Sequence, residues 1–281
     1  MVHVNGVELC VQTFGDPGDP SILLVGNTML TWPDGVCGRL AASGRHVVRY
    51  DLRDTGRSTT HDPDAPEYTL RDLVADAAGL IDVLGLGRTN VVGFATGGFI
   101  AQLLALDHPG RVSTLTLIAT RPTAPGPADP DLPEHSADVM AHVMGAPQPD
   151  WSDRASVVAY MVGMKRLFAG SEGIDEADVA REVGRIYDRA IEGEKAQRAN
   201  QMATVFAALD CGERWRERLG EIAVPTLVIH GEEDPFFPVG NARALAAEIP
   251  GAELLILPKT GQELPRRHWD VLCETLVRHT R

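Results

Sequence analysis

The sequence predicts an α/β protein with a doubly wound, mostly parallel sheet. Short apolar segments rich in β-branched residues alternate along the chain with segments that carry apolar residues at helical spacing. Strands that are apolar throughout are typical of a sheet buried on both faces. Alternation of strands and helices implies parallel strands joined by right-handed crossovers. One proline-, aspartate- and glycine-rich stretch interrupts the alternation, which indicates an insertion.

Six segments have the pattern of buried strands, and four other segments have helical periodicity. The predicted strands are residues 21–26 (SILLVG), 46–51 (HVVRYD), 89–94 (TNVVGF), 113–120 (STLTLIAT), 225–231 (PTLVIHG) and 253–258 (ELLILP). The predicted helices are residues 69–84, 98–106, 241–249 and 269–279.

The interruption follows the fourth predicted strand. Residues 121–150 are dense in proline, aspartate and glycine, and helix-like segments continue to about residue 219. We therefore predict a helical cap insertion over residues 121–220, with residues 1–120 and 221–281 forming the core. Ligands of open α/β sheets bind at the carboxyl ends of the strands, so we expect these loops to share one crevice beneath the cap.

The amino-acid composition and net charge exclude some classes of binding partner. The 281 residues are 44% hydrophobic, enough for a substantial core, and the formal net charge is −13. Nucleic acid and anionic membrane surfaces both need a basic footprint, so neither is expected as a partner. The crevice predicts a small-molecule substrate. The sequence shows no secretory signal and no run of about 18 apolar residues. The four cysteines (Cys10, Cys37, Cys211, Cys273) lack metal-type spacing. We expect a cytoplasmic protein without cofactor or metal, and a homodimer stays open.

The stretch VVGFATGGFIAQLLA begins as a strand and continues as a helix, with a glycine turn between them. Its Gly93-Phe94-Ala95-Thr96-Gly97 matches the G-x-S-x-G turn that carries a nucleophilic serine in many hydrolases, but alanine occupies the serine position. In such an elbow the central residue has a strained backbone and points into the crevice. A turn that serves only packing needs the same glycines, so that alternative stays open.

Two further positions match an acid and a base that would follow this turn in chain order. Asp234, in GEEDPFFP after a predicted strand, occupies the acid position, although a carboxylate there also suits a structural cap. The loop after the last predicted strand is expected to contain G-H-x-x-P, and the sequence has Gln262 in place of the histidine. Glutamine hydrogen-bonds but cannot take up a proton near neutral pH.

Backbone donors survive side-chain replacement. The N–H of Asn27 or Thr28, together with that of Thr96, is predicted to form an oxyanion hole. Trp32, Phe94 and Arg121 are predicted to contact the substrate, Arg121 through an anionic or phenolic oxygen. A solvated arginine at the hinge of the cap is the alternative for Arg121.

These positions together resemble the α/β-hydrolase superfamily over nearly the full chain. Within it, residues 47–60 (VVRYDLRDTGRSTT) and 14–25 (FGDPGDPSILLV) look like the aclacinomycin methylesterase group. Those enzymes remove a methyl ester from anthracycline polyketides in actinomycetes. The resemblance implies that the family nucleophile falls on Ala95, the acid on Asp234 and the base on Gln262.

The two replaced positions are those that perform the hydrolytic chemistry. Loss of a triad nucleophile or its histidine lowers the rate about a millionfold, whereas oxyanion donors and binding alone retain about 10³- to 10⁴-fold over water. We therefore predict a cofactor-independent, non-hydrolytic enzyme of aromatic polyketide tailoring: a cyclase, lyase, isomerase or decarboxylase. The alternatives are a non-catalytic polyketide-binding or carrier protein, or a residual or rewired hydrolase that uses His268 or Asp234 with water.

Overall fold

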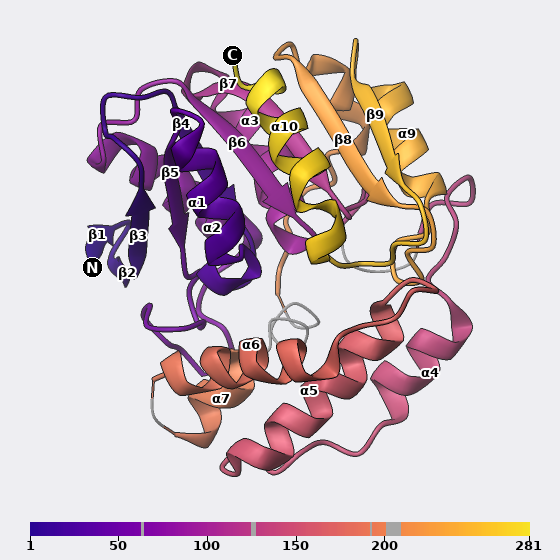
Figure 1. The fold of residues 1–281 in the computed structure, drawn as a ribbon. Coiled ribbons are helices and arrows are strands. Elements are labelled where there is room, and N and C mark those ends of the chain that lie inside the picture. The colour runs from indigo at the N-terminus through magenta and orange to yellow at the C-terminus, as the bar shows by residue number, and fades with distance from the viewer. Residues whose placement is uncertain (63–64, 125–127, 192, 201–208) are drawn as a thin grey trace.

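A seven-stranded sheet forms the centre of the molecule in the computed structural model, which describes residues 1–62, 65–124, 128–191, 193–200 and 209–281 (Figure 1). The strand order is β3-β5-β4-β6-β7-β8-β9, and every neighbouring pair is parallel except β3 with β5. The strands are β3 (Val11–Phe14), β4 (Ser21–Val25), β5 (His46–Tyr50), β6 (Thr89–Phe94), β7 (Val112–Ile118), β8 (Thr226–Gly231) and β9 (Glu253–Leu257). The predicted mostly parallel α/β sheet is confirmed, and β4 to β9 are the six predicted strands.

Helices cover both faces of this sheet (Figure 1). The four predicted helices are present, and α1 is an additional one. They are α1 (Asp34–Ala42), α2 (Leu70–Val83), α3 (Thr96–Asp107), α9 (Gly240–Glu248) and α10 (Trp269–His279). Short 3₁₀ helices are η1 (Met29–Thr31), η2 (Pro109–Arg111), η3 (Arg216–Glu221) and η4 (Arg266–His268). No helix within the described ranges is both long and apolar enough to cross a membrane.

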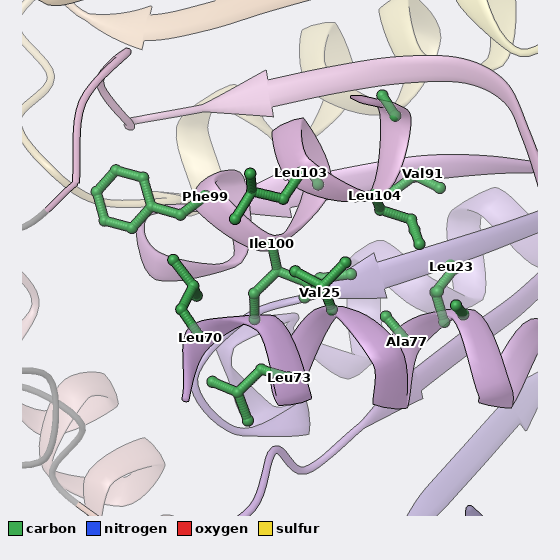
Figure 2. Packing of buried hydrophobic residues seen from close by; sticks show 14 of the residues in the cluster. Leu23, Val25, Leu70, Leu73, Ala77, Val91, Phe99, Ile100, Leu103 and Leu104 are labelled. Carbon is green, nitrogen blue, oxygen red and sulfur yellow. The ribbon is translucent and has the colours of Figure 1, made fainter. Parts of the chain in front are cut away.

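Successive residues of each central strand point to opposite faces, which divides the core into two clusters. In β4, Leu23 and Val25 join the cluster beneath α2 and α3, whereas Ile22 and Leu24 join the cluster beneath α1 and α10. Figure 2 shows the first cluster, where side chains of α2 and α3 meet Leu23 and Val25. Burial on both faces explains why apolar residues of these strands follow one another without polar alternation, as in Ile22–Val25 of β4.

The N-terminal strands are not predicted by the sequence. β1 (Val2–Val4) and β2 (Val7–Leu9) form a separate antiparallel pair, and β3 lies at the edge of the main sheet. Each has only three or four residues, and each exposes at least one side chain. An apolar run is therefore absent, and the signal that identifies β4 to β9 cannot appear.

Helices α4 (Ala137–Gly145), α5 (Arg154–Phe168), α6 (Glu176–Arg189) and α7 (Glu194–Ala199), here called the cap, lie beyond the carboxyl ends of the central strands (Figure 1). Asp153 and Asp175 cap the N-termini of α5 and α6 by accepting backbone N–H bonds. All four helices fall within the predicted insertion, of which residues 125–127, 192 and 201–208 lie outside the described ranges.

The C-terminal helix places a histidine against the sheet. His279 of α10 lies with its Nε2 3.1 Å from the Leu115 carbonyl oxygen, and burial lowers the pKa of its imidazole. Because the pKa of His279 is lower in the folded than in the unfolded chain, the unfolded chain binds the proton more tightly. The stability that is present above about pH 6.5 is therefore lost as the pH falls. We expect His279→Gln, which keeps a donor, to reduce the drop in the urea midpoint between about pH 7 and about pH 5. His142→Gln, on the exposed side of α4, is the control; an unchanged drop in His279→Gln would contradict the expectation.

Candidate active site

The turn between β6 and α3 has the geometry of a nucleophile elbow. Ala95 adopts φ 50° and ψ −112°, in a region that residues with a side chain rarely occupy. Its N–H donates to the Ile118 carbonyl oxygen at 2.9 Å, which fixes the turn against the end of β7. Ala95 is partly exposed, so its methyl group stands where a serine hydroxyl would have space.

The glycines of the turn are required by close approach of backbone segments. A Cβ on Gly93 would overlap the Gly97 carbonyl oxygen, and a Cβ on Gly97 would overlap the Val25 carbonyl oxygen. A Cβ on Gly98 would meet the side chain of Thr120. These contacts join β4, β6, α3 and the end of β7, so they hold the elbow whatever chemistry it performs.

Asp234 follows β8 and is fully buried. Its Oδ1 accepts the N–H groups of Phe236 at 2.9 Å and Phe237 at 2.8 Å, so this oxygen closes the turn after the strand. Its Oδ2 lies 3.3 Å from Nε2 of His230, but no described residue gives it a hydrogen bond. The carboxylate therefore has a structural use, together with one oxygen that lacks a donor.

His230 is the neighbour that the sequence analysis missed. It lies in β8, fully buried, and its Nε2 donates to the Phe237 carbonyl oxygen at 2.6 Å. A carbonyl oxygen can only accept, so the proton is on Nε2. The available signal was a histidine within an otherwise apolar strand, four residues before Asp234.

Gln262 lies in the loop after β9, at the position expected for the base. Its N–H donates to the carbonyl oxygen of Phe168 at 2.8 Å, which fastens this loop to the end of α5. Its side-chain Nε2 points to the Ala119 carbonyl oxygen at 3.5 Å. Since Oδ2 of Asp234 has no donor among the described residues, the amide does not replace the hydrogen bond that a triad histidine would make to the acid.

The candidate oxyanion loop follows β4. The N–H of Thr28 faces Oγ1 of Thr31 at 3.4 Å, and the N–H of Met29 donates to Oδ1 of Asp51 at 2.9 Å. Thr96 is the first residue of α3, and the first N–H groups of a helix have no acceptor within it. These contacts favour Asn27 over Thr28 as the partner of Thr96 in binding an oxyanion.

A cavity of about 770 Å³ separates the core from α5 and α6. This volume suits a drug-sized organic ligand. Its apolar wall includes Leu30, Pro33, Phe94, Ile174, Val179, Leu264 and Trp269, and charged side chains from α6 and the loop before α10 also line it. The cavity reaches the elbow at Phe94, whereas Ala95, Asp234 and Gln262 are absent from its lining.

Of the three predicted substrate contacts, the structure places one on this cavity. Phe94 lines it, and Trp32 is fully buried behind Phe94, with the two rings edge to face at 6.4 Å. Arg121 is 2% exposed, donates to the Ala124 carbonyl oxygen at 2.6 Å and lies over the ring of Phe237. The alternative of a solvated hinge arginine is wrong, because Arg121 is buried.

Carboxylates such as Asp34 and Glu182 line the cavity together with Lys165, whereas no histidine or cysteine of the described ranges does. Burial raises the pKa of the Cys37 and Cys273 thiols to about 11, so both stay protonated near neutral pH. His268 ends η4 and does not line the cavity. The acids and histidines of the described ranges form no group of three that could hold a metal ion.

Comparison with known proteins agrees with the fold and with the resemblance. The chain is 32% identical to rhodomycin D methylesterase DauP of Streptomyces sp. (strain C5), over 100% of this chain and 97% of that protein. It is 31% identical, with the same coverage, to rhodomycin D methylesterase DnrP of Streptomyces peucetius.

Among solved structures, a hydrolase from Pseudomonas aeruginosa PA01 is similar, with TM-score 0.72, 27% identity and coverage of 100% of this chain and 96% of that one. The enol-lactonase from Burkholderia xenovorans LB400 has the same fold, with TM-score 0.70, 23% identity and coverage of 98% and 97%. Residues 27–260 match the family described as "Serine aminopeptidase, S33". The chain therefore belongs to this α/β-hydrolase family and is related to the anthracycline methylesterases.

Proposed function

We propose that the protein is a cofactor-independent, non-hydrolytic enzyme of aromatic polyketide tailoring. The observation that carries the proposal is the state of the elbow: Ala95 has the strained conformation of a nucleophile but no oxygen, and Gln262 turns its amide to Ala119. Neither side chain can attack an ester carbonyl or accept a proton from a nucleophile. The full-length similarity to methylesterases of anthracycline biosynthesis supports the substrate class.

The remaining parts suit chemistry by positioning. A cavity of about 770 Å³ with an apolar wall that includes Phe94 and Trp269 fits a flat polycyclic ligand. Backbone N–H groups of Asn27 and Thr96 would stabilise a developing enolate or phenolate oxygen. Cyclisation, elimination, isomerisation and decarboxylation pass through such oxygens without a covalent acyl intermediate.

Two specific observations favour other functions. Asp234 is fully buried and uses Oδ1 within its own turn, which is the arrangement of a structural acid and suits a polyketide carrier without catalysis. The relatives named above are hydrolases, which favours a residual hydrolase in which water replaces the serine.

Product analysis separates these functions. The protein is incubated with an anthracycline-type methyl ester, the corresponding free acid and an uncyclised precursor, and products are followed by liquid chromatography and mass spectrometry. We expect a product of cyclisation, elimination, isomerisation or decarboxylation, formed without release of methanol. Rapid methanol release from the ester would contradict the proposal, and tight binding without any turnover would identify a carrier.

Two variants test whether the cavity is the substrate site, one in the cavity wall and one on the surface as its control. Phe94→Ala removes the aromatic wall at the elbow, whereas Val271→Ala shortens an exposed apolar side chain on α10. Turnover and binding should fall in Phe94→Ala by roughly tenfold or more, because a buried aromatic contact is worth over 1 kcal/mol. Val271→Ala should match the unchanged protein; equal effects of the two variants would remove the cavity from the proposal.

A further inference from the structure

We propose that Asp51 is a positioning residue that ties the cap to the candidate oxyanion loop, so that the seating of α6 controls the geometry of residues 27–29. Asp51 directly follows β5 and is fully buried. Among the described residues it forms no hydrogen bond or ion pair with the elbow or the cavity lining, and its role is to hold two other segments.

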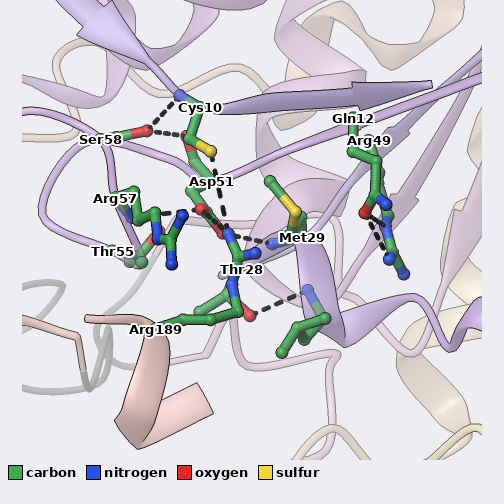
Figure 3. Close-up of polar contacts among 12 residues, drawn as sticks. Cys10, Gln12, Thr28, Met29, Arg49, Asp51, Thr55, Arg57, Ser58 and Arg189 are labelled. Atoms are coloured by element: carbon green, nitrogen blue, oxygen red, sulfur yellow. Dashed lines mark hydrogen bonds and ion pairs between the residues drawn. The ribbon is translucent and has the colours of Figure 1, made fainter. Parts of the chain in front are cut away.

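The carboxylate of Asp51 joins these segments through three donors (Figure 3). Oδ1 accepts the N–H of Met29 at 2.9 Å, and Met29 is the first residue of η1. Oδ2 accepts the Arg57 N–H at 3.2 Å and forms an ion pair with Nη2 of Arg189 at 2.6 Å. Arg189 is the last residue of α6, so one buried side chain contacts both the oxyanion loop and the cap.

Thr55 and Gly56, in the loop that begins at Asp51, make the same connection through further hydrogen bonds. Oγ1 of Thr55 donates to the Asn27 carbonyl oxygen at 2.8 Å. The Gly56 carbonyl oxygen accepts the N–H of Ile191 at 3.0 Å, and the Gly56 N–H donates to Oδ1 of Asn200 at 3.0 Å. Residues 51–56 thus make two contacts to the oxyanion loop and three to the segment from the end of α6 through α7.

Glycine at position 56 is what permits this crowding. Gly56 has φ +54°, and a Cβ there would overlap the carboxylate of Asp51. The loop therefore wraps directly around the carboxylate, with no space for another side chain. Movement of the cap end consequently shifts the carboxylate and, through it, the N–H of Met29.

A second cap-to-core ion pair shows why burial matters. Arg185, one turn earlier on α6, pairs with Asp34 at 3.0 Å, and these side chains are 56% and 50% exposed. Arg189 is 23% exposed and Asp51 is not exposed at all. Water can replace Arg185 at Asp34, but loss of Arg189 leaves a buried carboxylate with only two N–H donors. Asp51 must then shift, or admit water, to regain a third partner.

Hydrogen–deuterium exchange with mass spectrometry tests the coupling without reference to any activity. In Arg189→Leu we expect exchange to rise by about tenfold or more both in peptides of α6 and in peptides that cover residues 26–32. Arg189→Lys, which keeps the charge, should restore most of the protection in residues 26–32. Arg185→Leu is the matched control on the same helix and should leave residues 26–32 unchanged.

The result depends on whether exchange rises in both sets of peptides, those of α6 and those of residues 26–32, or in only one of them. Faster exchange in α6 alone in Arg189→Leu, or an equal rise in residues 26–32 for Arg185→Leu, would overturn the proposal. If Arg189→Leu unfolds, Arg189→Lys is compared with the unchanged protein. In that case faster exchange in α6 with unchanged protection of residues 26–32 would overturn the coupling, and a parallel rise in both would support it.

Discussion

Replacing Ala95 by serine and Gln262 by histidine in one variant is expected to raise the rate of ester cleavage at least about 10³-fold over the unchanged protein. The elbow already holds residue 95 in the conformation of a nucleophile, with φ 50°. Histidine at position 262 would supply the missing base. It would also be placed to donate to Oδ2 of Asp234, the buried oxygen that lacks a donor among the described residues. An aryl acetate and an anthracycline-type methyl ester are suitable substrates, with kcat/KM as the measurement.

The single variants are the controls, because triad residues act as a unit. Ala95→Ser alone gives a hydroxyl without a base, and Gln262→His alone gives a base without a nucleophile, so each should stay within about tenfold of the unchanged protein. A double variant no better than the singles would show that Asp234 or the oxyanion donors are misplaced for acyl transfer. Esterase activity of the unchanged protein at the level of the double variant would refute the non-hydrolytic proposal.

The sequence predicts most of the core because the central strands are buried on both faces. β4 to β9 show as short, largely apolar segments, and glycines mark the elbow at residues 93, 97 and 98. β1, β2 and β3 leave no such signal, because they are short and partly exposed. Helix α1 is missed for a related reason: its nine residues include two glycines and only a narrow buried side of Val36, Cys37 and Leu40.

The candidate site was predictable in its positions but not in its contacts. Chain order placed Ala95 after β6, Asp234 after β8 and Gln262 after β9, as the resemblance implied. The direction of the Gln262 amide depends on Ala119, and the burial of Arg121 depends on Phe237; both neighbours are distant in sequence. Such tertiary contacts have no local signature, and the tie between Asp51 and Arg189 spans 138 residues for the same reason.

Gly97→Ala is expected to destabilise the protein by about 3 kcal/mol or more, because a Cβ at this position would overlap the Val25 backbone oxygen. Backbone atoms of β4 in the sheet centre cannot move aside as a flexible side chain would. Gly97 is a residue of α3, where helix propensity by itself favours alanine. The cost of the overlap therefore has to exceed the gain in helix propensity. The sign of the measured change in the free energy of unfolding identifies the larger of the two effects.

Gly38→Ala measures the effect of helix propensity without an overlap. Gly38 lies in the interior of α1, and a Cβ there would meet no atom within 4 Å. We expect this variant to gain about 0.5–1 kcal/mol in the free energy of unfolding, measured by urea titration beside Gly97→Ala. A loss confined to Gly97→Ala would show that the elbow is held by contact between β4 and α3. A Gly97→Ala variant as stable as Gly38→Ala would mean that β4 and α3 separate without penalty, and the strained geometry at Ala95 would then lack its support.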